Sequence, residues 1–501
     1  MLRVLGSQRR LCDGLSRRDL LQIGGASAAG LGLSQLLSAQ AQANPTASSL
    51  PGFGRAKNCI VLFLYGSPSQ LETFDMKPEA PVEVRGTMQS IPSSLPGLDV
   101  CEHLPWMAKI MDRTTVVRSV THPHPIHGVA YAMTGTAVID VAMELNPRDE
   151  RHHPYFGSCV TYIDEQTGRP AAPDALQNIA LPFPFSSKRS DQPFRAGPYG
   201  AYLGAAFDPI WTEFQGEGTK HLRKERANGE FWFEGKEPYL GCTVDSHFRL
   251  AAVDRQPDLA LDRLDRRRSL IEQFNAARRD LDHSASTRAL GRFQDLAWSV
   301  LASPKIGDAL DVRKEPIATR ERYGHTLFGQ SCLAARRLVE AGTRVTSVFW
   351  DEYGLAGDAW DTHFDHFPRM IDQLCPGLDR AVYGLITDLE DRGMLDETLV
   401  VLVSEHGRTP KINNAAGGGR DHWSRAYSVM FAGGGTPRGS VIGATDSVAG
   451  DVTDRPVSPK SLLATMYHLL GIDPHATLTD RAGRPLPLVP HEAEVVRELL
   501  A

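Results

Sequence analysis

Three pairs of one carboxylate and one histidine lie between residues 361 and 422. The pairs are Asp361 with His363, Glu405 with His406, and Asp421 with His422. Carboxylate oxygen and imidazole nitrogen together suit borderline divalent cations, so the pairs predict a site for zinc, manganese or calcium, although calcium alone rarely uses histidine. Two of the pairs also have a plainer interpretation, because Asp361 with His363 is typical of a surface turn and Glu405 of a helix N-cap. The three pairs together favour the metal site.

Two arginines close to these pairs, Arg408 and Arg420, have the chemistry to hold an anion. A guanidinium matches a tetrahedral oxyanion with two parallel hydrogen bonds. As an anion clamp, the two side chains would act catalytically by stabilising the oxyanion of an ester. A structural ion pair is an equally good interpretation of each.

A third group of candidates lies in residues 122–127 (HPHPIH), just before a predicted helix that ends near Gly135. Histidine here could bind a metal, transfer a proton or form a covalent adduct, and the nearest hydroxyl belongs to Thr121. The alternative is that each histidine is a polar loop residue beside proline. We expect at least one of His124 and His127 to face the site as a catalytic group.

Four continuous apolar runs predict the strands that position these residues: 59–64, 115–120, 345–350 and 398–404. Such runs are typical of parallel strands covered on both faces. Helical patterns at 324–341 and 370–392 alternate with them, which predicts an α/β fold with an open, mostly parallel sheet. Sheets of this kind hold their sites at the carboxyl ends of the strands.

From this we expect the strands ending at Leu64, Val348 and Val403 to lie side by side or nearly so. The side chains expected to converge at their carboxyl edge are those of Asp361, Glu405 and His422.

The first 43 residues have the pattern of an export signal. Arg17 and Arg18 precede a short Gly/Ala-rich apolar run at 23–37 and the small residues Ala41 and Ala43. This pattern is typical of a twin-arginine signal peptide cleaved near Ala43, and it predicts a bacterial periplasmic or extracellular protein. A membrane anchor is the alternative, but the run is shorter than the about 20 apolar residues that a span needs. No stable membrane span is expected after cleavage.

The rest of the chain predicts one large domain. Residues 44–57 are expected to form a flexible leader, and residues 58–501 an α/β domain with an insertion around 182–300, including an amphipathic helix over 259–281. A formal net charge of -6 without a basic tract argues against nucleic acid as a partner. Six cysteines outside the signal permit disulfides without specifying a pairing.

Several longer motifs resemble those of one family. They are FLYGSPSQLETFDMKP at 63–78, CLAARRLVEAG at 332–342, WDTH at 360–363, SEHGRTP at 404–410 and GRDHW at 419–423. With the twin-arginine leader, the set resembles the DUF1501 proteins, which are related to the alkaline phosphatase/sulfatase superfamily. The resemblance implies a sulfatase-like sheet with flanking helices, and one or two divalent metals beside a nucleophile that attacks a phosphate or sulfate ester. It implies that Asp361, His363 and His422 hold one metal, and that Glu405 with His406 forms half of the second site.

Two features depart from the superfamily pattern. The first strand is followed by Gly66 and Ser67 in place of the aspartate for the second metal, and the nearest carboxylates are Glu72 and Asp75. The second site would therefore be rebuilt or absent. No C-x-P-x-R or S-x-P-x-R motif occurs, which argues against a formylglycine mechanism.

The sequence thus predicts an exported, metal-dependent hydrolase of sulfate or phosphate esters, acting on a small molecule or a polysaccharide. The alternative is a catalytically silent binding protein that keeps the sulfatase-like fold and a structural metal. The missing nucleophile motif favours the alternative. The number of histidines and aspartates in loops favours the enzyme, because a structural site needs only about four ligands.

Overall fold

The centre of the fold is strand β1 (Asn58–Leu64), which is flanked by β10 (Val345–Trp350) and β11 (Thr398–Val403). Both neighbours run parallel to β1. The prediction that these three strands are neighbours is therefore confirmed. Their side chains are almost all buried, which explains why each strand is a continuous apolar run rather than an alternating one.

In this computed structural model the described residues are 50–127, 129–136, 141–146, 149–170, 175–189, 195–225, 228–250, 304–353 and 359–501. The export signal, the first part of the leader and the helix expected over 259–281 lie outside them. Residues 51–501 form one unit. No helix among the described residues is long and apolar enough to span a membrane.

The main sheet has nine strands in the order β15-β4-β14-β11-β1-β10-β5-β6-β9. Its other members are β4 (Thr114–Val120), β5 (Asn178–Leu181), β6 (Ile210–Gln215), β9 (His247–Leu250), β14 (Tyr427–Ala432) and β15 (Ser440–Ile442). Strand β14 is antiparallel to both of its neighbours and β9 is antiparallel to β6, whereas the other pairs are parallel. The predicted mostly parallel sheet is confirmed. Strands β6 and β9, at one edge of it, come from the segment 182–300 for which the sequence predicts an insertion.

Short strands form small two-stranded sheets outside the main one. They are β2 (Ser90–Pro92) with β3 (Asp99–Cys101), β7 (His221–Glu225) with β8 (Phe231–Lys236), β12 (Gly407–Arg408) with β13 (His422–Trp423), β16 (Ala444–Thr445) with β17 (Val452–Asp454), and β18 (Thr477–Thr479) with β19 (Pro485–Pro487).

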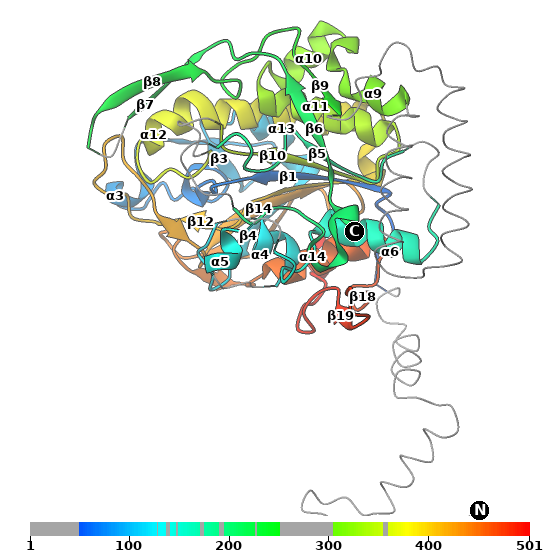
Figure 1. Cartoon of the computed structure of the whole chain (residues 1–501). Helices are drawn as coiled ribbons and strands as arrows, with labels where there is room; N and C mark the ends of the chain where they lie inside the picture. Colours follow the sequence, from blue (N-terminus) through cyan, green and yellow to red (C-terminus); the bar gives the residue numbers. More distant parts are fainter. Residues whose placement is uncertain are drawn as a thin grey trace, which may run out of the picture. The chain divides into compact units, whose positions relative to one another are not determined.

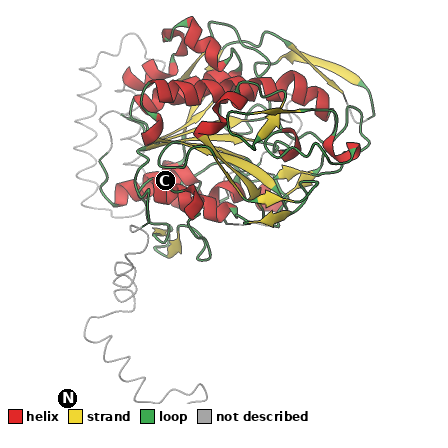
Figure 2. Ribbon diagram, turned by 180° about the vertical axis from the view of Figure 1, so that it is seen from behind, coloured by secondary structure: helices red, strands yellow, loops and turns green. Residues whose placement is uncertain are grey.

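Helices cover both faces of the main sheet (Figures 1 and 2). On one side lie α9 (Pro304–Leu310), α10 (Ile317–Tyr323), α11 (Leu327–Glu340) and α13 (Cys375–Asp391), and on the other α4 (Ala130–Thr134), α6 (Phe156–Gln166) and α14 (Pro459–Leu469). Shorter helices are α3 (Val82–Arg85), α5 (Val141–Glu144) and α12 (His366–Arg369). The six cysteines of the described residues are buried and free.

One of the two predicted helices begins later than the apolar pattern suggested. Helix α11 starts after Thr326, whose side chain accepts a hydrogen bond from the Gly329 N–H as an N-cap. The pattern at 370–392 is confirmed as helix, but its first turn is a π-helix over Met370–Leu374 and α13 follows with Pro376 in its first turn. Proline lacks the N–H that an interior helical position needs, so it fits where a new helix begins.

The turn after β1 brings its backbone against the loop after β10. A Cβ added to Gly66, which has φ +91°, would lie 2.3 Å from the Asp361 nitrogen. We expect Gly66→Ala to lower the free energy of unfolding by about 1–3 kcal/mol more than Gly97→Ala, because overpacking adds to the backbone strain. Gly97 is a matched control, since its φ is +85° and no atom lies within 4 Å of its added Cβ. Urea unfolding of both variants measures the difference, and equal destabilisation would contradict the close approach.

Candidate metal centre

The side chains of the site come from the carboxyl ends of three strands and from one small hairpin. His127 follows β4, Asp361 and His363 follow β10, and Glu405 with His406 follows β11 directly. His422 opens β13 and lies opposite Arg408 of β12. Because β4 is separated from β11 by the antiparallel β14, all these strands present the same end to this edge. Segments more than 200 residues apart in the sequence therefore meet at one place.

Four of these residues form what we call the outer group: His127, Asp361, His363 and His422. Their ligand atoms lie within 4.8 Å of one another. The Nε2 atoms of His363 and His422 are 3.0 Å apart. The nearer carboxylate oxygen of Asp361 is 3.1 Å from the first of these nitrogens and 3.4 Å from the second. This is the spacing of atoms that share one metal ion.

His127, Glu405 and His406 form a second cluster, the inner group, whose ligand atoms also lie within 4.8 Å of one another. All three side chains are buried. One oxygen of Glu405 accepts a hydrogen bond from the Gly66 N–H at 2.7 Å. Glu405 Oε2 and His406 Nε2 have no hydrogen-bond partner among the described residues. Burial of such atoms without a partner is unfavourable, and a cation or donor in the inner group would satisfy them.

The contacts of the histidine Nδ1 atoms, which face away from the site, determine whether the Nε2 atoms that face the site carry a proton. Nδ1 of His406 contacts the Gly407 carbonyl at 2.8 Å, and Nδ1 of His422 contacts the Pro125 carbonyl at 3.2 Å. A carbonyl oxygen only accepts, so both Nδ1 atoms carry the proton and both Nε2 atoms present a lone pair. In the same way His363 Nδ1 contacts Asp421 at 2.7 Å. Lone pairs that converge without a donor fit a bound metal ion, and outward hydrogen bonds of this kind orient metal ligands.

The charges around the site favour the metal-binding forms of three ligands but not of all. Burial opposes protonation of His127, but Asp361 and Glu405 outweigh it and raise its pKa to about 9, and Asp361 also raises the pKa of His363. Burial opposes ionisation of Asp361, but Arg408 and His127 outweigh it and hold the pKa of that carboxyl well below its usual range. Burial and nearby cationic groups lower the pKa of His406, and burial lowers that of His422. Both imidazoles are thus neutral, as metal binding requires.

The family is shown by comparison with known proteins. The family model of the DUF1501 proteins, which is described as a protein of unknown function, matches residues 56–500. The chain belongs to the DUF1501 family. The resemblance seen in the sequence motifs is thereby confirmed, and it extends over the whole α/β domain.

Solved structures similar to this DUF1501 protein include a sulfatase from Pseudoalteromonas sp. and the phosphonate monoester hydrolase from Silicibacter pomeroyi. The sulfatase is 11% identical, the match covers 93% of this chain and 75% of the sulfatase, and the TM-score is 0.37. The hydrolase is 11% identical, with 89% and 76% of the two chains covered and a TM-score of 0.34. A search of curated proteins finds no match.

The two arginines of this DUF1501 protein were expected to hold an anion, but the structure shows both guanidinium groups bonded to protein acceptors. Arg408 is fully buried and donates to the carbonyl oxygens of Gly66, Ser67 and Arg420 as well as to Asp361. It holds Asp361 against the turn after β1. Each of its three guanidinium nitrogens thus has a protein acceptor, which argues against a role in holding an ester oxyanion.

Arg420 lies farther from the ligands and is also fully buried. It donates to Glu72 and to the carbonyl oxygens of Val84, Thr409 and Pro410. The expectation that it steadies an oxyanion does not fit these contacts, because its hydrogen bonds go to a buried carboxylate and to backbone carbonyls. It acts as a structural ion-pair residue, the alternative interpretation of the sequence.

Four further candidates of the sequence analysis lie outside the two groups. Asp421 is 57% exposed and contacts His363 from outside, so it orients a ligand instead of being one. His124 belongs to neither group, and its ring lies 5.0 Å from that of Tyr131. Glu72 and Asp75, the carboxylates nearest to the first strand, also lie outside both groups. Asp75 pairs with Lys77 and Arg118.

His127 has a more central position than the sequence specified, because it belongs to both groups. The sequence left metal binding, proton transfer and covalent catalysis open for the histidines of residues 122–127. Its position three residues before α4, in a loop directly after a buried strand, was the available signal. Only the packing shows that His127 and not His124 faces the carboxylates.

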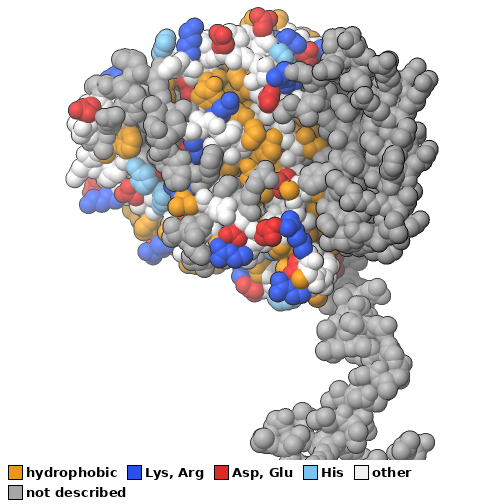
Figure 3. Space-filling view, viewed as in Figure 1, with side chains coloured by type: hydrophobic (Ala, Val, Ile, Leu, Met, Phe, Trp, Pro, Cys, Tyr) orange, Lys and Arg blue, Asp and Glu red, His pale blue; other side chains and the backbone are white. Residues whose placement is uncertain are grey.

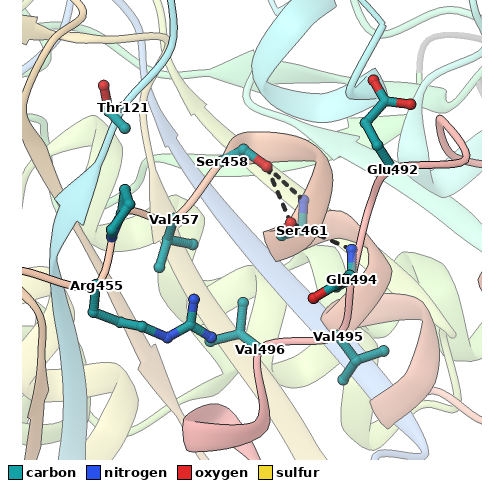
Figure 4. Close-up of a pocket in the computed structure, with 10 residues that line it drawn as sticks. Thr121, Arg455, Val457, Ser458, Ser461, Glu492, Glu494, Val495 and Val496 are labelled. Carbon is teal, nitrogen blue, oxygen red and sulfur yellow. Dashed lines mark hydrogen bonds between the residues drawn. The ribbon is translucent and has the colours of Figure 1, made fainter.

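A pocket elsewhere in this protein lies beside the start of α14 (Figure 4). Its lining includes Thr121, Arg455, Ser458 and Glu492, none of which belongs to either group. Ser458 caps the helix, and Arg455 pairs with Glu498. On the face shown in Figure 3, acidic and basic side chains of the described residues are interspersed.

Proposed function

We propose that this protein is an exported, metal-dependent hydrolase of sulfate or phosphate esters, with the reaction at the outer group. The observation that supports it most is that the outer ligands reach the surface. The side chains of His363, His422 and Asp361 are 36%, 24% and 20% exposed, whereas that of Glu405 is 2% exposed. Catalytic metal sites keep a position open to water and substrate, whereas structural sites are closed by protein ligands.

The chain's own residues prepare the outer group for that task. A divalent ion bound there would supply a Lewis acid for an ester oxygen and an acidified water as nucleophile. Arg408 orients Asp361, Asp421 orients His363, and the Pro125 carbonyl orients His422. No side-chain nucleophile is required for hydrolysis by this route, which is consistent with the missing C/S-x-P-x-R motif.

The alternative, a catalytically silent binding protein with a structural metal, has one observation in its favour. Arg408 and Arg420 are both engaged by protein acceptors, so neither guanidinium is available to an ester anion. An enzyme built on this centre would neutralise the anion with metal charge alone. The two functions predict different results with the same purified protein.

The deciding experiment combines elemental analysis with an assay on aryl sulfates and aryl phosphates. An ester hydrolase contains a divalent metal and releases the aryl alcohol, and Asp361→Asn lowers the metal content and abolishes the release. Glu397→Gln, which affects only an exposed ion pair with Lys57, serves as the control and retains both. Metal without turnover on either substrate class would overturn the proposed function and favour the binding protein.

Export belongs to the same proposal and rests on the twin-arginine pattern at the start of the chain. We expect the precursor with Arg17→Lys and Arg18→Lys to stay in the cytoplasm, because that export route is specific for the arginine pair. Cell fractionation and immunoblotting measure the distribution. Unchanged export of the double variant would remove this part of the proposal.

A further inference from the structure

His127 joins the outer and inner groups through opposite atoms of one ring. Its Nε2 lies 3.1 Å from Asp361 Oδ2, in the outer group. Its Nδ1 lies 3.0 Å from Glu405 Oε1, in the inner group. The two nitrogens of an imidazole point away from each other, so they cannot both bind the same ion. They can bind two different ones.

The distances fit such an arrangement on both sides of the ring. Histidine nitrogen and carboxylate oxygen each lie about 2.0–2.2 Å from a bound zinc ion, which places two ligands of one ion about 3–3.5 Å apart, depending on the angle between them. Each nitrogen of His127 has a carboxylate oxygen at that separation. The ring is also held in place, because its centroid lies 4.1 Å from that of His422, 5.3 Å from that of His406 and 5.4 Å from that of Tyr65.

Hydrogen bonds alone do not account for the centre. A neutral imidazole carries one N–H, so it donates to only one of the two carboxylates and turns a lone pair toward the other. A doubly protonated ring would satisfy both contacts but would leave Glu405 Oε2 and His406 Nε2 buried without a partner. A cation in the inner group satisfies these two atoms together with His127 Nδ1.

We propose that His127 bridges two divalent ions, one in each group, so that the centre is dinuclear. The outer ion is bound by Asp361, His363, His422 and His127 Nε2, and the inner ion by Glu405, His406 and His127 Nδ1. When the second ion binds, the remaining N–H bond of the ring breaks and its proton passes to water, so the bridge is an imidazolate. No electron is transferred. The missing aspartate after β1 is thus replaced by a histidine from the loop after β4.

This inference extends the metal binding of the proposed function but does not depend on hydrolysis. Two ions without turnover would leave the bridge intact and overturn the hydrolase. Turnover with a single bound ion would overturn the bridge and leave the hydrolase intact.

The test is metal titration of the chelator-treated full-length mature protein with Zn2+, followed by mass spectrometric metal analysis. We expect two equivalents in the wild type and one in His406→Ala, which removes an inner ligand only. His363→Ala removes an outer ligand only and is also expected to bind one. His127→Ala should weaken both ions, whereas His124→Ala, a nearby histidine outside both groups, should retain two.

Copper provides a second measurement on the wild type itself, which keeps the proposal testable if His127→Ala does not fold. Two Cu2+ ions across an imidazolate are magnetically coupled, so the paramagnetic resonance signal per copper should fall when the second equivalent binds. His406→Ala should give the full signal of one isolated copper. A wild type that saturates at one equivalent, or that shows two uncoupled coppers, would overturn the bridge, as would two tightly bound ions in His127→Ala.

Discussion

Replacing Glu72 with alanine is expected to lower the free energy of unfolding by about 3–5 kcal/mol, the usual effect of removing one partner from a buried ion pair. The side chains of Glu72, Arg420 and His366 are all fully buried. Glu72 accepts hydrogen bonds from Arg420 and, at 3.2 Å, from His366. Without the carboxylate, the Arg420 guanidinium would remain in the interior with only carbonyl partners.

Urea unfolding at neutral pH measures this loss, and Glu397→Ala is the matched control. Glu397 pairs with Lys57 at the surface, where an ion pair contributes about 0–1 kcal/mol. Glu72→Gln retains the shape and tests the charge if the alanine variant does not fold. Equal destabilisation by Glu72→Ala and Glu397→Ala would contradict a structural role for the buried pair.

The stability of the protein at acid pH should also depend on the ionised Glu72 carboxylate. Burial opposes ionisation of Glu72, but Arg420 and His366 outweigh it and lower the pKa of Glu72 to about 2, from an ordinary value of 4.5. A carboxyl with a depressed pKa in the folded state stabilises it above the ordinary pKa, and this stabilisation is lost as the pH falls from 4.5 toward 2. The difference in stability between wild type and Glu72→Gln should therefore shrink over that range.

The sequence predicted the part of this structure that follows from burial. The runs 59–64, 345–350 and 398–404 are apolar because both faces of those strands are covered, and that pattern is visible without coordinates. Once these strands are parallel neighbours, the residues that follow them must meet at one edge. The convergence of Asp361 and Glu405 could therefore be expected from chain order alone.

The roles of Arg420 and Glu72 could not be predicted in this way. They are 348 positions apart, and each lies among residues whose types suit a catalytic site. A guanidinium that binds substrate and one that binds a buried carboxylate have the same sequence signature. Only the packing of the loop after β1 against the segment before β13 distinguishes the two.

A second limit concerns the histidines, whose function depends on which nitrogen faces the site. The sequence gives the positions of His127 and His422, but the carbonyl that contacts Nδ1 of His422 belongs to Pro125, nearly 300 residues earlier. That contact leaves the Nε2 lone pair for a metal. Ring orientation is a property of the folded loops and has no local sequence signal.

Replacing His422 with alanine is expected to remove the ion of the outer group. His422 Nε2 lies within 3.4 Å of Asp361 and 3.0 Å of His363 Nε2, so its loss leaves the outer group with one fewer directed lone pair. Because a divalent ion is held by a few such ligands, removal of one weakens binding far more than loss of a nearby surface carboxylate. Metal analysis after dialysis, with calorimetric titration for the affinity, measures the effect.

Asp421→Asn is the matched control for His422→Ala, because the two residues are adjacent and the Asp421 carboxylate contacts the outward nitrogen of His363. Loss of such an orienting contact typically weakens metal affinity by about 10–100-fold without removing the site. Asp421→Asn should therefore reach wild-type stoichiometry at saturating metal, whereas His422→Ala should not. Wild-type metal content in dialysed His422→Ala would show that the outer group is not a metal site. Loss of a full equivalent in Glu72→Gln would instead show that the turn after β1 supplies a ligand, which its buried contacts with Arg420 and His366 argue against.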